Sequence, residues 1–352
     1  MCALSFLSNF LPCVSVCKKR NSEGEVSCLF ENMSLMKGGR IAVETRLKTE
    51  PEETVLVVTD TKMLKIAEAL ACCAASVGAR TTVMIMEPTR RHGDEPPKPV
   101  AEAMKAAEVV LAPTYMSLSN TDARRNATKQ GARIASMPGI TERMMSIGAL
   151  TADYKKVASL TDKVATLVQK CIAVTISTPS GTDLTMSIKE RQPMRDTGLI
   201  HKPGDWGNLP AGEVALAPVE ESTNGTLVID NLVDAALGLS VTQPLRIVVK
   251  HGRARSFVGS DAAKLKSILE MADKNAYNIA ELGIGTNPKA RLIGNVLEDE
   301  KVLGTVHIAL GDNTSFPGGH TKSNIHLDGI LLQPTVKIDN RSLMQNGKLM
   351  VK

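Results

Sequence analysis

Aromatic side chains are scarce in this chain of 352 residues. Tryptophan, tyrosine and phenylalanine make up 3% of the sequence, and the net charge is only +5. Lysine and arginine form no extended block. Proteins that bind nucleic acid combine clustered positive charge with aromatic rings that stack on bases. The composition therefore indicates no nucleic-acid partner.

Other features are also lacking. The body of the chain has no run of 18 apolar residues, so no transmembrane helix and no membrane partner are expected. No G-x-G-x-x-G follows the first expected strand, which argues against a dinucleotide site. The seven cysteines contain no C-x2-C pair and suggest no disulfide framework. We expect a cytoplasmic protein of ordinary globular composition, 43% hydrophobic and 22% charged.

Residues 1–35 differ from the rest of the chain. They hold four of the seven cysteines and three of the five phenylalanines. Their positive charges follow the apolar run, whereas a secretory signal places them before it. Three interpretations stay open: a real N-terminal extension, a membrane-surface or targeting segment, or a start codon assigned too far upstream. The last is favoured, with Met33 or Met36 as the true start.

Residues 36–150 alternate between short β-branched apolar runs and helical patterns. This alternation is typical of βαβ units and predicts a three-layer α/β domain. Strands are expected at Thr54–Asp60, Thr81–Met86, Val109–Pro113 and Arg133–Met137, and helices at Lys62–Ser76, Val100–Ala107, Asn120–Gly131 and Ile140–Ile147.

Residues 151–352 have a different texture, which predicts an α+β domain. An amphipathic helix at Ala152–Lys170 is expected to join the two domains. One further helix is expected at Asp261–Asp273, and the C-terminal tail from Leu331 predicts a closing hairpin. Strands are expected at Ile172–Thr178, Asp183–Ile188, Glu213–Val219, Gly225–Asp230 and Arg246–Phe257.

Four polar residues stand in apolar surroundings between residues 279 and 329: Glu281, His307, His326 and Asp328. In a strand, residues two apart share a face, so His326 and Asp328 would converge. Burying them is costly unless their charge is compensated, and a divalent metal is the simplest compensation. For His307 alone, a hydrogen-bonded core histidine is the competing interpretation.

A fifth candidate follows the segment WGNLPAGE. Proline and glycine fix the turn, which delivers Glu213 to the start of an apolar strand. A carboxylate at the mouth of a strand is a usual position for a metal ligand. A solvated glutamate at a strand end is the alternative.

Four motifs resemble those of the thermophilic metallo-aminopeptidase family, aminopeptidase T and its relatives, across residues ~170–345. They are NLPxGEV with a following AP, ELGIGTN, GTVHIALG and HxDG. In that family two metal ions are held by two glutamates, two histidines, an aspartate and a tyrosine. Five of the six positions are matched here by Glu213, Glu281, His307, His326 and Asp328. The tyrosine position holds Thr314, which departs from the pattern.

A second branch of this superfamily, the dihydroxypyridine ring-cleaving dioxygenases, is similar in fold. The resemblance implies one iron there, held by two histidines and an aspartate. That branch carries a histidine at the position of Glu281 and apolar residues at those of Glu213 and His307. Because this chain keeps all three peptidase-type groups, the motifs favour two metals and hydrolysis over one iron and oxygenation.

The expected reaction is therefore aminopeptidase-type hydrolysis of a small amide or N-terminal peptide bond. Two divalent ions (Zn, Co or Mn) would share a water and lower its pKa. Asp328 would bridge the ions, with Glu213 and His307 completing one site and Glu281 and His326 the other. Glu213 and Glu281 would thus be catalytic as well as ligating. The resemblance also implies a homodimer.

Three further positions are assigned to substrate binding: Arg195 and His201, which flank the WGNLPAGE turn, and Thr314. The two basic residues would hold a substrate carboxylate, or belong to a solvated basic loop. His320 is assigned as a catalytic proton donor in place of the absent tyrosine. Two alternatives to the hydrolase stay open. One is an Fe(II) ring-cleaving dioxygenase of the 2,5-dihydroxypyridine type, and the other is an inactive metal-binding protein.

Overall fold

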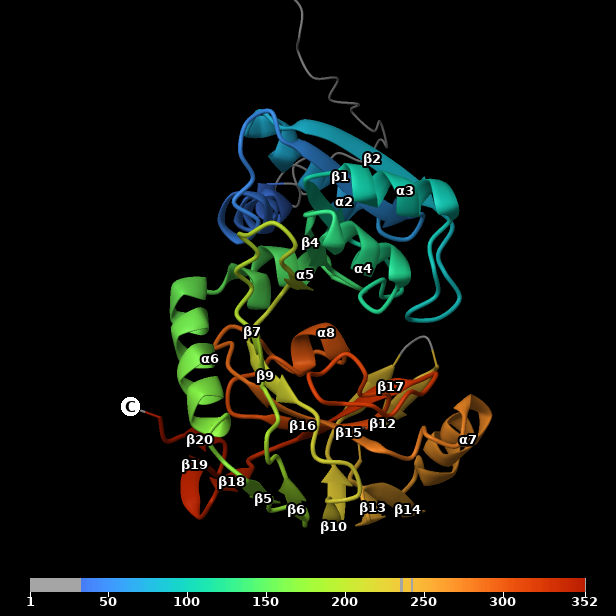
Figure 1. Cartoon of the computed structure of the whole chain (residues 1–352), viewed down its shortest axis with the longest axis vertical. Helices are drawn as coiled ribbons and strands as arrows, with labels where there is room; N and C mark the ends of the chain where they lie inside the picture. Colours follow the sequence, from blue (N-terminus) through green and yellow to red (C-terminus); the bar gives the residue numbers. More distant parts are fainter. Residues whose placement is uncertain (1–32, 235–236, 242, 352) are drawn as a thin grey trace, which may run out of the picture.

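The structure, a computed structural model, describes residues 33–234, 237–241 and 243–351. Most of the N-terminal extension, residues 1–32, therefore lies outside the described residues. The chain forms an upper and a lower half that face each other, with the helix α6 running along one side (Figure 1). No described helix is long and apolar enough to cross a membrane.

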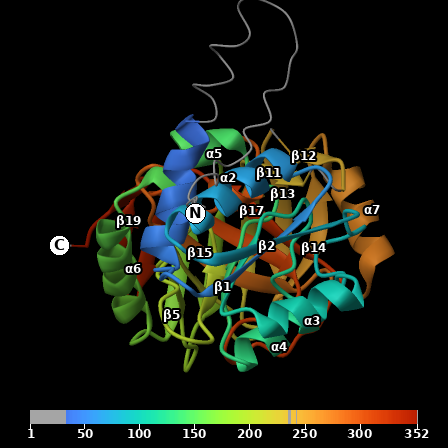
Figure 2. The same cartoon turned by 90° about the horizontal axis from the view of Figure 1, so that it is seen from above.

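The upper half contains a parallel sheet in the strand order β2-β1-β3-β4-β8. Alternate residues of its strands point to opposite faces, so both faces bury apolar side chains. The helix α2 covers one face, and α3 and α4 cover the other (Figure 2). The predicted three-layer α/β arrangement is confirmed. The strands are β1 (Thr54–Asp60), β2 (Arg80–Met86), β3 (Val109–Ala112), β4 (Arg133–Ser136) and β8 (Trp206–Asn208).

The helices of the upper half begin and end close to the expected positions. Thr121 caps α4 by accepting a hydrogen bond from the backbone of Arg124, and Thr141 caps α5 in the same way through Met144. The elements are the π-helix η1 (Ile41–Arg46), α2 (Leu64–Ser76), α3 (Lys98–Ala106), α4 (Asp122–Lys129), α5 (Glu142–Ser146) and the 3-10 helix η2 (Ala149–Thr151).

One strand of the upper sheet comes from far along the chain. β8 pairs in parallel with β4, matching Asn208 to Ser136. The chain thus leaves the upper half at α6 (Tyr154–Val168) and returns to it before entering the lower half again at β9. The predicted domain division near residue 150 does not include this return.

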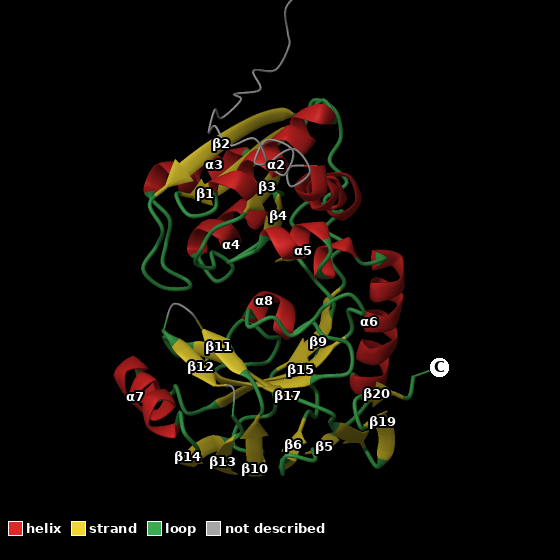
Figure 3. Cartoon of the chain, turned by 180° about the vertical axis from the view of Figure 1, so that it is seen from behind, coloured by secondary structure: helices red, strands yellow, loops and turns green. Residues whose placement is uncertain are grey.

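The lower half is built from antiparallel sheets (Figure 3). The first has eight strands in the order β14-β13-β10-β6-β5-β18-β19-β20, and the second, called here the site sheet, has five in the order β17-β16-β15-β9-β7. A small third sheet pairs β11 with β12. This confirms the predicted α+β character. The site-sheet strands are β7 (Met194–Asp196), β9 (Glu213–Leu216), β15 (Ile279–Gly285), β16 (Val306–Gly311) and β17 (His326–Leu331).

The remaining elements complete the eight-stranded sheet and its surroundings. They are β5 (Ala173–Ser177), β6 (Asp183–Ser187), β10 (Asn224–Ile229), β11 (Leu232–Asp234), β12 (Leu239–Val241), β13 (Leu245–Lys250), β14 (Arg253–Val258), α7 (Ala262–Ala272), α8 (Val296–Asp299), β18 (Thr335–Ile338), β19 (Arg341–Gln345) and β20 (Lys348–Leu349). The expected closing hairpin is present, since β19 pairs antiparallel with β18 and with β20.

The segment Arg246–Phe257 corrects one prediction. It was expected as a single strand, but it is a hairpin in which β13 turns back into β14. The turn residues His251 and Gly252 both have positive φ angles, of 50° and 66°. The break coincides with the polar segment Lys250–Arg253 and its glycine, a turn signal that the prediction of one continuous strand passed over.

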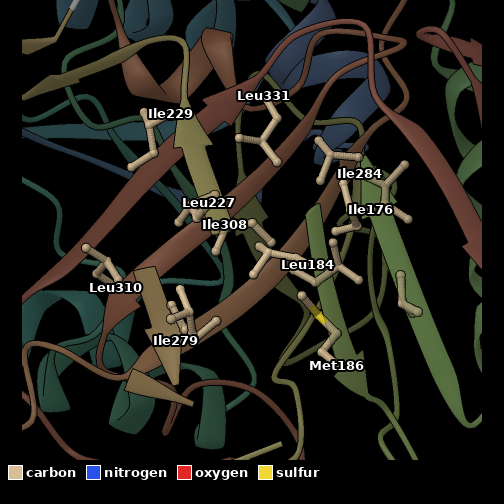
Figure 4. Packing of buried hydrophobic residues seen from close by; sticks show 14 of the residues in the cluster. Ile176, Leu184, Met186, Leu227, Ile229, Ile279, Ile284, Ile308, Leu310 and Leu331 are labelled. Atoms are coloured by element: carbon tan, nitrogen blue, oxygen red, sulfur yellow. The ribbon is translucent and has the colours of Figure 1, made fainter. Parts of the chain in front are cut away.

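The core of the lower half lies between its two large sheets. Ile176 and Leu184 from the eight-stranded sheet meet Ile284 and Ile308 from the site sheet, and all four are buried (Figure 4). Because side chains alternate along a strand, the site sheet turns its other face toward the upper half. That outer face carries the candidate site.

The helix α6 ties the two halves together. The hydroxyl of Thr161 lies 2.7 Å from that of Thr286 at the end of β15. The buried Tyr154 hydroxyl accepts a hydrogen bond of 3.1 Å from the backbone N–H of Ala211 in the NLPAG turn, and its ring lies 4.2 Å below the guanidinium of Arg46. The turn that precedes Glu213 is therefore held from the joining helix.

We predict that Tyr154→Phe lowers the free energy of unfolding by about 1–3 kcal/mol, because it leaves a buried N–H without a partner. Urea unfolding measures this loss. Tyr277→Phe is the matched control, because the half-buried Tyr277 hydroxyl makes no hydrogen bond in the described part of the chain. Equal losses in both variants would contradict this account of the turn.

Candidate metal centre

The outer face of the site sheet gathers the five residues that the motifs single out: Glu213, Glu281, His307, His326 and Asp328. Along β16, His307 points away from its neighbours Val306 and Ile308, which enter the core. Along β17, Leu327 enters the core between His326 and Asp328. The predicted convergence of the HxD pair is confirmed.

Glu281 stands between the two histidines. Its Oε2 lies 2.9 Å from Nε2 of His326, and its Oε1 lies 3.2 Å from Nε2 of His307. Nε2 of His326 is also 3.4 Å from Oδ1 of Asp328. Glu281, His326 and Asp328 each bring one ligand atom within 4.8 Å of the others. We call these three residues the first ligand group.

A second ligand group lies beside the first. It consists of Glu213, Glu300 and His307, with ligand atoms again within 4.8 Å of one another. Oε2 of Glu213 is 3.5 Å from Nε2 of His307. Glu213 and His307 were predicted to share a metal, whereas Glu300 was not predicted as a ligand.

Gly283 makes room for the second group. It pairs with His307 across the strands β15 and β16. A Cβ atom at position 283 would lie 1.9 Å from Nε2 of His307. No side chain larger than hydrogen fits under the imidazole, which accounts for the first glycine of ELGIGTN.

A lysine is buried among these carboxylates. The side chain of Lys301 is 0% exposed. Its ammonium donates to Oε1 of Glu213 at 2.6 Å and to Glu300, and it lies 3.7 Å from Oδ2 of Asp196. Burial alone would lower the pKa of Lys301, but the three carboxylates raise it well above its ordinary value. Lys301 is therefore a fixed positive charge inside the cluster.

The cluster attracts further positive charge. Burial would lower the pKa of His307, but the hydrogen bond and charge of Glu281 raise it to about 9. The pKa of His326 is likewise raised, against burial, by Asp328 and Glu281. Burial would raise the pKa of Glu281, but the two histidines outweigh it and hold that pKa well below its usual range. In the metal-free cluster, protons on the two histidines offset part of the carboxylate charge, and a bound cation would take their place.

A second hydrogen bond orients His326. Its Nδ1 lies 2.8 Å from the backbone oxygen of Asp312, to which it donates when Nε2 is the free nitrogen. This arrangement is common for histidines that bind metals, because the outer partner fixes the tautomer and leaves Nε2 for the ion. The ring of Phe316 lies 6.0 Å from the imidazole, centroid to centroid.

Several buried atoms in the cluster have no hydrogen-bond partner in the described part of the chain. They are Oε2 of Glu213, Nδ1 of His307, Oδ1 of Asp328 and Oδ2 of Asp196. A buried polar atom without a partner costs free energy, and native structures rarely leave four together. Carboxylate oxygens and imidazole nitrogens without thiolates suit Fe, Mn, Co or Zn. The residues present therefore fit a transition-metal ion.

The cluster forms the floor of a cavity of about 230 Å³ between the two halves. The upper half supplies the opposite wall with Ser119, Trp206 and Asn208. Ser315 closes one side, where its hydroxyl donates to Oδ1 of Asn120 at 2.8 Å.

Four residues with assigned roles are not brought to this cavity. Arg195 pairs with Asp162 beside α6, at 3.1 Å. His201 contacts the backbone oxygen of Thr45. Neither lines the cavity, so their roles in substrate binding stay predictions without support from the geometry.

The loop after β16 holds the other two. Thr314 is exposed and bonds to Asp312 through its hydroxyl, at 2.8 Å. The side chain of His320 is 75% exposed and pairs with Glu220, at 3.2 Å. Both lie outside the cavity lining, whereas Ser315 and Phe316 of the same loop line it. The catalytic role assigned to His320 and the substrate-binding role assigned to Thr314 gain no support from these positions.

Glu300 and Lys301 were not predicted from the sequence. They follow the short helix α8 in the segment LEDEK, where Glu298 and Asp299 are also buried. A run of four charges in five residues usually indicates a solvated turn. The only signal in the sequence was that LEDEK comes directly before the GTVHIALG strand. This signal is too weak to tell a buried charged cluster from an exposed one.

We predict that Lys301→Met lowers the free energy of unfolding of the metal-free protein by about 3–5 kcal/mol, because it leaves buried carboxylates without their cation. Urea unfolding with a chelator measures this loss, and adding Mn²⁺ should recover part of it. Lys266→Met is the control, because Lys266 and Glu270 form an exposed pair that contributes about 0–1 kcal/mol. Similar losses in both variants would show that the cluster does not depend on Lys301.

The chain matches known proteins along most of its length. The model of the 2,5-dihydroxypyridine 5,6-dioxygenase (NicX) family matches residues 42–351. The 2,5-dihydroxypyridine 5,6-dioxygenase of Pseudomonas putida KT2440 is 24% identical over 261 residues, which are 70% of this chain and 71% of that protein.

Two solved structures share the fold. That of 2,5-dihydroxypyridine dioxygenase from Pseudomonas putida KT2440 has a TM-score of 0.78 at 18% identity and covers 91% of this chain and 98% of its own. Wild-type AmpT from Thermus thermophilus has a TM-score of 0.67, also at 18% identity, and covers 91% and 100%.

The aminopeptidase resemblance is thus confirmed for the fold, while the family is the dioxygenase branch that the motifs placed second. The family model covers both halves and every residue of the two ligand groups. The chain belongs to the 2,5-dihydroxypyridine 5,6-dioxygenase family of enzymes.

Proposed function

We propose that this protein is a non-haem Fe(II) dioxygenase that opens a small hydroxylated N-heteroaromatic ring. The family membership supports this proposal, and the size of the cavity carries it. At about 230 Å³, the cavity falls below the roughly 300–1,000 Å³ of sites for drug-sized ligands. It suits a single ring better than a peptide.

The first ligand group would hold the metal through Glu281, His326 and Asp328, and His307 stands ready as a second imidazole. A bound Fe(II) with open coordination positions would bind and activate O₂ beside the ring. Residues outside the ligand group hold the ligands in place. Asp312 fixes His326, and Lys301 holds the adjacent carboxylates in place.

The walls of the cavity define the shape of the substrate. Leu232 and Leu297 offer apolar contact and Phe316 an aromatic edge, so a flat ring lies against surfaces that exclude water. The loop that holds Phe316 is anchored by Asn313, whose amide donates to Glu220 at 2.9 Å. These contacts would keep the substrate ring above the carboxylates and histidines.

The ligand set departs from that implied by the resemblance to the dioxygenase branch. Glu281 takes the place of a histidine, so the first group offers one imidazole and two carboxylates. The second imidazole, His307, comes from the neighbouring strand β16. This set still leaves one side open toward the cavity, because the ligands all project from one face of the site sheet.

A second candidate function keeps specific support. The two ligand groups lie side by side, as a dinuclear hydrolase would need. The similarity in fold to AmpT agrees with it. In that case two Zn, Co or Mn ions would replace one iron, and a small amide would replace the ring. A homodimer, as the resemblance implies, stays a prediction under both functions.

We expect protein loaded anaerobically with Fe(II) to consume O₂ when 2,5-dihydroxypyridine is added, with loss of the aromatic absorbance and no external reductant. An oxygen electrode and absorbance measure both changes. His326→Ala should lower the rate at least 100-fold, since it removes a central ligand. His320→Ala is the matched control and should retain the rate, because that histidine lies outside the cavity.

The hydrolase function predicts the opposite result. Protein loaded with Zn²⁺, Co²⁺ or Mn²⁺ would cleave aminoacyl amides and consume no O₂. Amide hydrolysis without oxygen consumption by the iron form would overturn the dioxygenase proposal. If the protein binds metal but catalyses neither reaction, the inactive metal-binding protein is the remaining interpretation.

A further inference from the structure

Three polar side chains line up at one edge of the upper sheet, opposite the metal centre. Ser136 ends β4 and Asn208 ends β8, and these two residues pair across the strands. Ser119 lies in the loop after β3. In parallel sheets, ligands bind beyond the carboxyl ends of the strands. Ser119 and Asn208 both line the cavity.

The two hydroxyl groups fix the amide of Asn208. Ser119 Oγ lies 3.1 Å from Oδ1 of Asn208, to which it donates, and 2.8 Å from Oγ of Ser136. Ser119 is 6% exposed and Ser136 is 1% exposed, so water competes little for these contacts. With its oxygen engaged, Asn208 keeps its Nδ2 group as a donor, and no described residue accepts from it.

The charge of the cavity limits what Asn208 would bind. The lining holds seven carboxylates and no lysine or arginine. A bound metal offsets part of this charge, but a ring with its own carboxylate would still meet repulsion without a partner. A neutral amide N–H is suited to a neutral acceptor, such as a ring nitrogen or a ring carbonyl.

We propose that Asn208 donates a hydrogen bond to an uncharged acceptor on the edge of the substrate ring that faces away from the metal. Asn208 is then a specificity residue. It orients the ring and separates N-heteroaromatic rings from carbocyclic rings with the same hydroxyl groups. This inference rests on the proposed ring-binding function of the cavity.

The protein contains its own reporter for this contact. Trp206 is the only tryptophan of the chain and lines the same cavity. It lies two residues before Asn208 on β8, so both side chains leave the strand on one face. The guanidinium of Arg124 lies 3.8 Å above its ring. A ligand that enters the cavity should therefore change the tryptophan fluorescence.

The test compares two ligands on the Fe(II)-loaded protein without oxygen, so that binding is measured without turnover. 2,5-Dihydroxypyridine and 1,4-dihydroxybenzene carry the same pair of hydroxyl groups, but only the first has the ring nitrogen or carbonyl acceptor. The wild-type protein should bind the first about tenfold more tightly, as one shielded hydrogen bond allows. In Asn208→Leu, which keeps the branched shape of the side chain and removes the donor, the ratio should fall to about one.

Two further variants sharpen the result. Ser119→Ala removes the hydroxyl that fixes the amide, and the ratio should fall to a value between those of wild type and Asn208→Leu. Asn126→Leu makes the same substitution on the exposed face of α4 and should keep the tenfold ratio. The ratio compares two ligands on one protein, so a partial loss of folded protein affects both measurements equally.

The outcomes separate this inference from the proposed function. An unchanged ratio in Asn208→Leu, with O₂ consumption retained in the wild type, would overturn the role of Asn208 alone. A ratio that depends on Asn208 in a protein without O₂ consumption would keep the inference and remove the dioxygenase. Equal binding of both ligands by the wild-type protein would overturn the inference directly.

Discussion

The burial of charge on one face of the site sheet is the constraint on which the rest of the structure depends. Five carboxylates, two histidines and Lys301 lie together where water has little access. Such a cluster is stable only if each charge has a partner. Lys301 meets part of this requirement, and four buried polar atoms still lack a hydrogen bond from any described residue. A metal ion would complete this compensation, and the proposed metal site rests on that electrostatic requirement.

The two halves of the chain form a cavity above this cluster, where a ligand could reach it. The site sheet holds the ligands on a rigid outer face, because its inner face packs in the core of the lower half. The parallel sheet supplies a neutral polar wall at the carboxyl ends of its strands. Strand β8 connects the two, since Asn208 ends it and Glu213 follows five residues later. A short segment thus places one group on each side of the cavity.

Sequence analysis predicted the elements whose pattern is local. β1 was predicted with its observed bounds, because an unbroken β-branched run leaves little choice. The five motif residues converge as expected, since alternation fixes their face. β8 was missed, because Trp-Gly-Asn has no strand pattern and pairs only with a distant strand. Lys301 was missed because a charged run looks solvated until the fold covers it. The preference for hydrolysis rested on ligand identity, and the family match favours the dioxygenase.

The most direct test of the account is the metal content of protein purified without chelators or added metal, measured by plasma mass spectrometry. The account predicts iron at about one equivalent per chain, the number that one open ligand group holds. Two equivalents of zinc, cobalt or manganese would contradict the dioxygenase in favour of the dinuclear hydrolase. No bound metal, even after reconstitution with each ion, would contradict the central claim that the buried cluster is a metal site.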